Sequence, residues 1–468
     1  MLKLKFTLLT LLVIAFQHEA SAQLPYTQDA YSYDSIMNVV YGTALDYAGS
    51  IDTLKMDIYK PLGDNNCARP VMVIAHGGAW VAGSKEDINT VLISRYLAKR
   101  GWVVANINWR LGTHKTSSYN MYALCNTSIS APCGYISDSA EVFRANFRGM
   151  QDMKGAIRFM KNRFLIDSTD VNNVYICGES AGGFVALATA FTDQASEKHP
   201  TCFAIADAPT PSSNLNTYGC NPTPNNLSRP DLGSIDGDLN LGIHDASVKG
   251  VGNFYGALFD LTSLNQLSDT PSVYLFHQGA DIVVNYNYGR VLGRTSWECF
   301  QQTNICQPYY FYPYAYGSKS IATYYTSLGS AAPTFQADII ENYNYLNNCF
   351  SNGHSIDNVY TRAQAMIDLF ANDIDASGND PLTNCTTFSL EEDLVSHIQL
   401  YPNPVANELN ISGIFTTMNF NITDQLGRIV LKGNLDSKTA VIATNNLSSG
   451  SYFLHLNEYG KALHFIKK

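Results

Sequence analysis

The chain has 468 residues, and its 46% of hydrophobic and 15% of charged residues allow a large core and exclude wholesale disorder. This length predicts two or three domains. The formal net charge of −10 argues against nucleic acid and anionic membrane surfaces as partners.

The N-terminus has the pattern of an export signal. Lys3 and Lys5 precede an apolar run from Phe6 to Phe16, and Ala20-Ser21-Ala22 offers a cleavage site. We expect residues 1–22 to be a signal peptide, which is too short to be a membrane anchor. We also expect no transmembrane anchor elsewhere, so the mature chain would be secreted or held at the cell surface.

All ten cysteines follow the predicted cleavage site, and an exported chain can keep them as disulfides. The pairs Cys125/Cys133 and Cys299/Cys306 bracket short, loop-like segments and are plausible disulfides. Cys177 and Cys202 lie in apolar segments that we predict to be strands, and we expect them to be buried thiols. The remaining connectivity is left open.

Strands and helices alternate through about the first 350 residues. In chain order we predict strand 52–59, strand 71–75, helix 91–99, strand 102–107, helix 143–164, strand 174–177, helix 183–190, strand 203–206, strand 273–276 and helix 357–371. Such alternation predicts a mostly parallel α/β sheet, and its continuous apolar strands predict helices on both faces.

Two long stretches interrupt this alternation. Residues 209–265 are polar and show little periodicity, and residues 295–345 are very rich in tyrosine. Loops of this length are uncommon unless they are functional, so we expect two cap insertions within a domain that spans residues 23–376.

The pattern changes near residue 376. Residues 377–396 are turn-rich, polar and acidic, and we expect a linker there. From residue 397 to residue 468 only short strands alternate with turns, which predicts a small all-β sandwich. This part holds no cysteine and no cluster of acids and bases.

The strongest motif is Gly178-Glu179-Ser180-Ala181-Gly182, which lies between a predicted strand and a predicted helix. In this setting G-x-S-x-G is typical of a nucleophile elbow, in which the serine is exposed on a strained turn. The next amide, that of Ala181, would point from the helix N-terminus toward developing negative charge. A merely tight turn is the alternative.

His76-Gly77-Gly78-Ala79-Trp80 directly follows a predicted strand and suits an oxyanion hole, because residues without side chains let backbone amides approach an oxyanion closely. We expect the amides of Gly77, Gly78 and Ala181 to form that hole. A glycine-rich turn is the alternative, and we expect His76 to be structural.

An activated serine also needs a base and an orienting carboxylate. Asp281 follows a buried strand and is the candidate acid, although it could instead stabilise its own turn. His354 is the candidate base, because it is the sole histidine between Asp281 and the predicted linker. A surface-loop histidine is the alternative for His354, and we expect His277 to be a packed residue.

The order Ser180, Asp281, His354, together with His76–Trp80, resembles an α/β-hydrolase of the carboxylesterase type. The H-G-G-x-W form, followed by Gly83-Ser84-Lys85-Glu86-Asp87, is similar to bacterial feruloyl-esterase-like and acetyl-ester-removing enzymes. The resemblance covers roughly residues 40–371 and differs from the hormone-sensitive-lipase form H-G-G-G at Ala79. It implies an ester substrate, with no cofactor and no metal.

The C-terminal part resembles the sorting domain of type IX (Por) secretion. The resemblance rests on Tyr401-Pro402-Asn403-Pro404, Leu426-Gly427-Arg428, Leu447–Tyr452 and the terminal Phe465-Ile466-Lys467-Lys468. It implies a Bacteroidetes-type bacterium and passage across the outer membrane by the type IX secretion machinery. An Ig-like carbohydrate-binding module is the alternative.

We therefore expect a secreted serine carboxylic-ester hydrolase that acts through Ser180, His354 and Asp281. By resemblance, its substrate would be an acetyl or feruloyl ester of a polysaccharide, or a similar ester. The alternatives are a secreted dipeptidyl-type serine peptidase and a non-catalytic surface binding protein with a hydrolase fold.

Overall fold

The computed structural model describes residues 24–114, 138–206, 228–242, 244–265, 270–291, 312–341, 353–376, 399–412, 418–435, 440–456 and 462–468. The predicted signal peptide, the predicted linker and both predicted disulfide pairs lie outside these residues. Within them, no helix is long and apolar enough to cross a bilayer.

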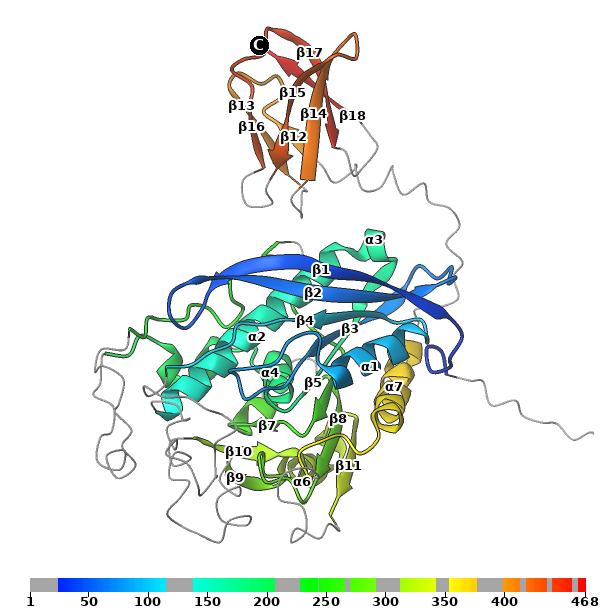
Figure 1. Cartoon of the computed structure of the whole chain (residues 1–468), viewed down its shortest axis with the longest axis vertical. Coiled ribbons are helices and arrows are strands. Elements are labelled where there is room, and N and C mark those ends of the chain that lie inside the picture. The colour runs from blue at the N-terminus through cyan, green and yellow to red at the C-terminus, as the bar shows by residue number, and fades with distance from the viewer. Residues whose placement is uncertain are drawn as a thin grey trace, which may run out of the picture.

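An eight-stranded sheet organises the first part of the chain (Figure 1). Its order is β1-β2-β4-β3-β5-β6-β8-β11. The pairs β1–β2 and β2–β4 are antiparallel, and every later pair is parallel. The strands are β1 (Ser32–Leu45), β2 (Ile51–Leu62), β3 (Arg69–Ala75), β4 (Val103–Ile107), β5 (Thr169–Glu179), β6 (Gly250–Phe254), β8 (Ser272–Gln278) and β11 (Phe335–Ile340). The prediction of a mostly parallel sheet is confirmed.

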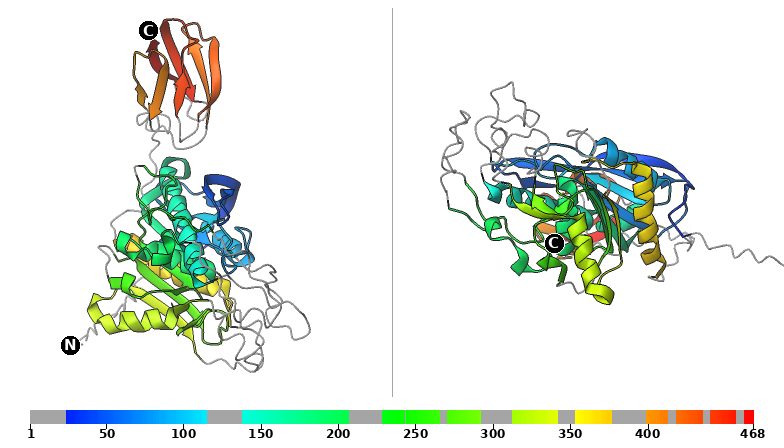
Figure 2. Two further views of the ribbon diagram at one scale, coloured as in Figure 1. Left: turned by 90° about the vertical axis from the view of Figure 1, so that its left-hand side faces the viewer. Right: turned by 90° about the horizontal axis from the view of Figure 1, so that it is seen from below.

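Helices cover both faces of this sheet (Figures 1 and 2). Alternate residues of the central strands enter two separate cores: Val73 lies in one, and Met72 and Ile74 lie in the other. The first core includes side chains of α2 (Ser139–Asn162), α4 (Ala181–Phe191) and α6 (Ser318–Leu328). The second includes side chains of α1 (Ile88–Ala98) and α7 (Val359–Ala376). A short helix, α3 (Phe164–Asp167), follows α2.

The structure differs from prediction inside the first expected insertion. Residues 250–254 form β6, a fully buried central strand, and β7 (Ala257–Leu258) follows it. This strand lacks an apolar run because helix α7 lies close to the sheet there. A Cβ at Gly250 would stand 2.6 Å from the Phe370 ring, and one at Gly252 would stand 2.3 Å from the Met366 sulfur.

The second expected insertion also contains regular elements of the domain. Strand β10 (Tyr314–Gly317) pairs with β7 and with β9 (Tyr288–Arg290) in a small separate sheet. Helix α6 follows β10, and the next strand, β11, forms the edge of the main sheet. The tyrosine-rich composition hid this pattern, because β11 is only half-buried and shows no clear alternation.

The strand predicted at 203–206 is wrong. Residues 200–202 form a short 3-10 helix, and Ile205 makes a single isolated bridge to Arg229. Cys202 therefore lies in that turn rather than in a strand. The prediction of buried free thiols at Cys177 and Cys202 is nevertheless confirmed.

The C-terminal part forms two antiparallel sheets around a core of its own. One sheet has the order β12-β13-β16 and the other β15-β14-β17-β18. Their bounds are β12 (Gln399–Tyr401), β13 (Glu408–Ser412), β14 (Met418–Asp424), β15 (Ile429–Leu435), β16 (Val441–Ala443), β17 (Gly450–Leu456) and β18 (Ala462–Lys467). The sandwich architecture agrees with the prediction.

Candidate active site

The Gly178–Gly182 segment forms a sharp turn between β5 and α4. Ser180 at its apex has φ 52° and ψ −122°, a strained conformation for a residue with a side chain. The backbone N–H of Ser180 donates to the carbonyl of Phe254 at 2.9 Å. Glycine is required on both sides, since a Cβ at Gly178 would lie 2.1 Å from the Gly182 oxygen. The turn thus has the strand–turn–helix form of a nucleophile elbow.

The structure brings Ser180, His354 and Asp281 together from three distant parts of the chain. The Nε2 atom of His354 lies 2.8 Å from the Ser180 hydroxyl, and the Nδ1 atom lies 2.8 Å from Oδ2 of Asp281. These two contacts define one tautomer: Nδ1–H donates to the carboxylate, and Nε2 is free to accept the hydroxyl proton.

Asp281 is fully buried, and several donors hold its carboxylate. The backbone N–H groups of Val283 and Val284 donate to Oδ1 at 2.8 and 2.9 Å. Oδ2 lies near His354 and also 3.2 Å from Nε2 of His277. Burial favours the neutral acid, but the neighbouring His354 and the hydrogen bond from His277 outweigh it and hold the pKa of Asp281 below its usual value.

His277 packs beneath this carboxylate. Its ring is fully buried, with Nδ1 lying 3.1 Å from the Ser318 hydroxyl and Nε2 lying 3.0 Å from the Val284 carbonyl. The expectation of a packed histidine agrees with this position. His277 contacts Asp281, while His354 contacts both Asp281 and Ser180.

The expected oxyanion loop lies directly against the serine. A Cβ at Gly77 would stand 3.1 Å from Cβ of Ser180, and Ala181 supplies the first amide of helix α4. Gly78 has φ 116°, and its carbonyl accepts from the amides of Val81 and Ala82, both at 3.0 Å. This tight turn holds the glycine backbone beside the Ser180 side chain. The role of Gly77, Gly78 and Ala181 as oxyanion donors remains a prediction.

Aromatic packing and hydrogen bonds hold the same loop in place. The indole N–H of Trp80 donates to the Asn146 carboxamide oxygen at 3.1 Å. The His76 ring stacks on Trp109 at 5.3 Å between centroids, and its Nδ1 donates to the Gly77 carbonyl at 2.7 Å. Burial lowers the pKa of His76, so a neutral ring is favoured. These contacts suit the structural role expected for His76.

Two further residues border the site and were not singled out from the sequence. Glu179, only 5% exposed, accepts from the Tyr255 hydroxyl at 2.6 Å and from the Asn89 amide at 3.1 Å. The Tyr255 ring meets the His354 ring edge-on at 4.7 Å. Burial, reinforced by Asp87, raises the pKa of Glu179 to about 7. Glu179 could have been singled out from the sequence, because it lies inside the G-x-S-x-G motif. Tyr255 could not, because it follows β6, a strand that was not predicted.

Among the described residues, no group of three or more His, Cys, Asp or Glu side chains could hold a metal ion. The arrangement suits acyl transfer by a serine: a hydroxyl within reach of a basic nitrogen, an oriented imidazole, and backbone amides beside the reacting centre.

Two family models match the chain. The one described as BD-FAE matches residues 56–148, which contain the His76–Trp80 loop. The one described as a secretion system C-terminal sorting domain matches residues 399–468, which form the sandwich. The fold is that of an α/β-hydrolase, and the BD-FAE match covers one part of it.

The curated relatives of this chain are longer proteins that it matches over short parts. Bile salt-activated lipase from Homo sapiens is 31% identical over 144 residues, covering 29% of this chain and 16% of the lipase. Carboxylesterase 3 from Pongo abelii is 28% identical over 169 residues, covering 36% of this chain and 26% of the relative. This chain therefore matches about a quarter or less of these relatives' length.

Solved structures of esterases are also similar to this chain. A truncated form of a carbohydrate esterase from gut microbiota has a TM-score of 0.40 at 17% identity, covering 74% of this chain and 99% of that one. The apo form of Thermogutta terrifontis esterase 2 has a TM-score of 0.37 at 15% identity, covering 75% and 96%.

Proposed function

We propose that this protein is a serine carboxylic-ester hydrolase in which Ser180 is the nucleophile, His354 the general base and Asp281 the orienting acid. One observation carries the proposal: the His354 ring bridges the Ser180 hydroxyl and the Asp281 carboxylate with two contacts of 2.8 Å. Base and nucleophile within hydrogen-bond reach, with the base oriented by a third group, are the signature of an activated serine.

The chemistry follows from that arrangement. The Ser180 oxygen attacks the ester carbonyl while its proton passes to Nε2 of His354. The amides of Gly77, Gly78 and Ala181 would stabilise the oxyanion, and Asp281 would stabilise the imidazolium. His354 then protonates the leaving alcohol, and an acyl group remains on Ser180. A water molecule, deprotonated by His354, releases the acid and restores the hydroxyl.

The substrate class is a second part of the proposal. The H-G-G-x-W loop and the match to BD-FAE support an acetyl or feruloyl ester of a polysaccharide, or a similar carboxylic ester. The C-terminal sorting domain supports export to the cell surface or the medium by the type IX secretion machinery. The predicted signal peptide would supply the first step of that export.

Two measurements test the proposal. A fluorophosphonate probe should label the wild-type chain at Ser180 and should not label Ser180→Ala, because only an activated serine reacts with it. Absence of labelling in a folded protein would favour the non-catalytic binding protein instead.

Turnover of p-nitrophenyl esters, acetylated xylan and methyl ferulate, compared with dipeptidyl anilides, then separates an esterase from a peptidase. We expect hydrolysis of the esters and none of the anilides. Faster cleavage of the anilides would favour the dipeptidyl-type peptidase and contradict the proposed substrate class.

A further inference from the structure

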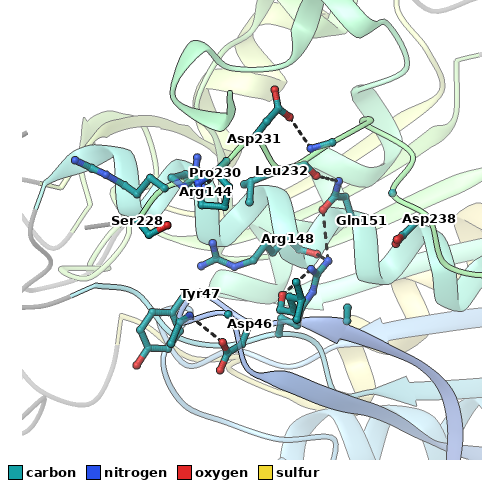
Figure 3. A pocket seen from close by; sticks show the side chains of 18 of the residues that line it. Asp46, Tyr47, Arg144, Arg148, Gln151, Ser228, Pro230, Asp231, Leu232 and Asp238 are labelled. Carbon is teal, nitrogen blue, oxygen red and sulfur yellow. Dashed lines mark hydrogen bonds between the residues drawn. The ribbon is translucent and has the colours of Figure 1, made fainter. Parts of the chain in front are cut away.

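A second polar cavity lies in the hydrolase domain and contains none of the proposed catalytic residues. Its volume is about 640 Å³, within the range of small-molecule sites. Figure 3 shows this arginine pocket, which we define by five of its lining residues: Tyr47, His114, Glu141, Arg144 and Arg148. The guanidinium of Arg148 lies in the open space between Ser228 on one side and Tyr47 and Asp46 on the other.

Within the described residues, Arg144 and Arg148 are two buried cations without a hydrogen bond to a carboxylate. They are four residues apart on α2 and therefore share one face of the helix. Arg148 is 2% exposed, and its one hydrogen bond among the described residues runs to the Gly112 carbonyl at 2.8 Å. Arg144 is 3% exposed and donates to three backbone carbonyls, those of residues 201, 203 and 230.

The other charged groups that line the cavity are already engaged. Arg110 is paired with Asp152 at 2.7 Å, and Arg229 is paired with Asp138 at 2.7 Å. Asp231 is paired with Lys198. The side chain of Asp46 accepts from backbone N–H groups in its own hairpin. The negative charge of Asp238 favours the charged forms of Arg110 and Arg158.

Glu141 is the carboxylate with the largest effect on Arg148, and it does not neutralise the pair of cations. Its Oε2 accepts from the His114 amide at 2.8 Å, and its Oε1 is 3.7 Å from Arg229 and has no hydrogen-bond partner in the described structure. Burial lowers the pKa of Arg148 to about 10 and also lowers that of Arg144, so both guanidinium charges are poorly compensated.

Several polar atoms in the pocket are buried and have no hydrogen-bond partner within the described ranges. They are Nε of Arg148, Nε of Arg229, Nε2 of His114 and Oε1 of Glu141. Buried polar atoms in folded proteins are nearly always satisfied, so each of these atoms calls for a partner. A ligand that satisfies both Arg148 and Glu141 must carry an anion for the guanidinium and a hydroxyl donor for the carboxylate oxygen.

An aromatic ring lines the same cavity. The Tyr47 ring is half-buried and meets the His114 ring edge-on at 5.3 Å. It also packs on the backbone of Gly112, where a Cβ would stand 2.1 Å from the ring. These contacts fix the Tyr47 ring, whose apolar face could pack against the ring of a hydroxylated ligand.

We propose that the arginine pocket binds a hexuronate, a sugar that combines a carboxylate with several hydroxyl groups in a volume suited to this cavity. The carboxylate would bind Arg148 and Arg144, a hydroxyl would donate to Glu141, and the sugar ring would lie against Tyr47. The inference concerns binding and does not depend on the proposed catalytic role of Ser180, because that residue does not line the pocket.

The test uses the full chain with Ser180→Ala, so that no turnover disturbs the measurement. Titration calorimetry or ligand-observed NMR measures binding of D-glucuronate, of D-glucose as the neutral match and of inorganic phosphate as a plain anion. We expect D-glucuronate to bind at least tenfold more tightly than either. Equal or tighter binding of glucose or phosphate, or no binding of glucuronate, would overturn the proposal.

The variant Arg148→Met tests where the ligand binds, and its thermal midpoint provides a second measurement. It should weaken glucuronate binding at least tenfold while leaving the thermal midpoint unchanged or raised, because it removes a poorly compensated buried charge. Arg158→Met is the matched control: Arg158 is buried on the same helix, donates to the carbonyls of Leu239 and Asp236, and does not line the pocket.

The control should lower the thermal midpoint and keep glucuronate affinity. Unchanged affinity in Arg148→Met would overturn the assignment. Should Arg148→Met fail to fold, Tyr47→Ala in the exposed hairpin provides an independent variant, and it should weaken glucuronate binding several-fold. Full retention of affinity by Tyr47→Ala would then overturn the proposal.

Discussion

The serine site and the arginine pocket both bury charge in the hydrolase domain, but they differ in how that charge is compensated. The Asp281 carboxylate has two histidine contacts and two backbone N–H donors. Arg148 has a single carbonyl acceptor and a buried Nε without a partner in the described structure. The Asp281 carboxylate therefore has several donors, whereas the Arg148 guanidinium has no carboxylate hydrogen bond among the described residues.

This difference has an energetic meaning. Removing one partner from a satisfied buried pair leaves an uncompensated charge and costs roughly 3–5 kcal/mol. Removing a buried charge that was never compensated costs little or can stabilise. The two regions should therefore respond in opposite ways to neutral substitutions, and the following predictions test that contrast.

The largest expected effect is on turnover at the serine site. Ser180→Ala should lower ester hydrolysis by a factor on the order of 10⁴–10⁶, because the nucleophile is removed while oxyanion contacts remain. Circular dichroism should show a native fold, and glucuronate affinity should be unchanged. A variant that keeps a large share of wild-type turnover would contradict the role of Ser180.

His354→Ala should be nearly as damaging as Ser180→Ala, because nucleophile and base act as one unit. The matched variant is His277→Ala, which touches the same carboxylate but does not reach the serine. Steady-state turnover of p-nitrophenyl acetate is the measurement. Near wild-type activity in His354→Ala together with an inactive His277→Ala would show that the base has been assigned to the wrong histidine.

Glu179 provides a pH test beside the serine. Its folded-state pKa is raised to about 7, so the folded protein holds this proton more tightly than the unfolded chain does. The contribution of Glu179 to stability should therefore fall as pH rises from about 4.5 to about 7. Glu179→Gln should gain stability relative to wild type over this range, on the order of 1–3 kcal/mol by neutral pH.

The measurement for Glu179 is chemical denaturation of both proteins between pH 5 and pH 8. Glu408→Gln, which changes an exposed glutamate in the sandwich, is the control and should show no such trend. A constant difference between Glu179→Gln and wild type at all pH values would mean that Glu179 is charged throughout.

The smallest expected effect on activity and binding comes from removing the sandwich, which supplies no residue to the serine site or the arginine pocket. Its core is formed entirely by residues from Val405 onward, and the proposed catalytic residues all precede residue 376. A chain that ends at Asp380 should therefore fold, keep its ester turnover and keep its glucuronate affinity.

Cell fractionation tests the sorting role of the same truncation. In the native host the shortened enzyme should stay in the periplasm, because the sorting domain is absent. Activity of the truncated protein in the medium would contradict the sorting role. Normal export with lost binding to insoluble polysaccharide would instead favour a carbohydrate-binding module.

The sequence by itself determined the local parts of this protein. The G-x-S-x-G pattern, after an apolar strand and before a helix, predicted the elbow at Ser180. The His76–Trp80 loop and Asp281 were predicted in the same way, because strand ends and glycine-rich turns depend on neighbouring residues. His354 was predicted by elimination among the histidines that follow Asp281. The parallel sheet and the sandwich were likewise predictable from apolar periodicity.

Only the tertiary structure decided what depends on contact between distant segments. Strand β6 was missed because helix α7 requires glycines there, which removes the apolar signal. Tyr255 reaches Glu179 and His354 only after the sheet has formed. The arginine pocket joins the 44–49 hairpin, helix α2 and residues 228–241. The burial of Arg148 without a carboxylate hydrogen bond among the described residues depends on the packing of these segments.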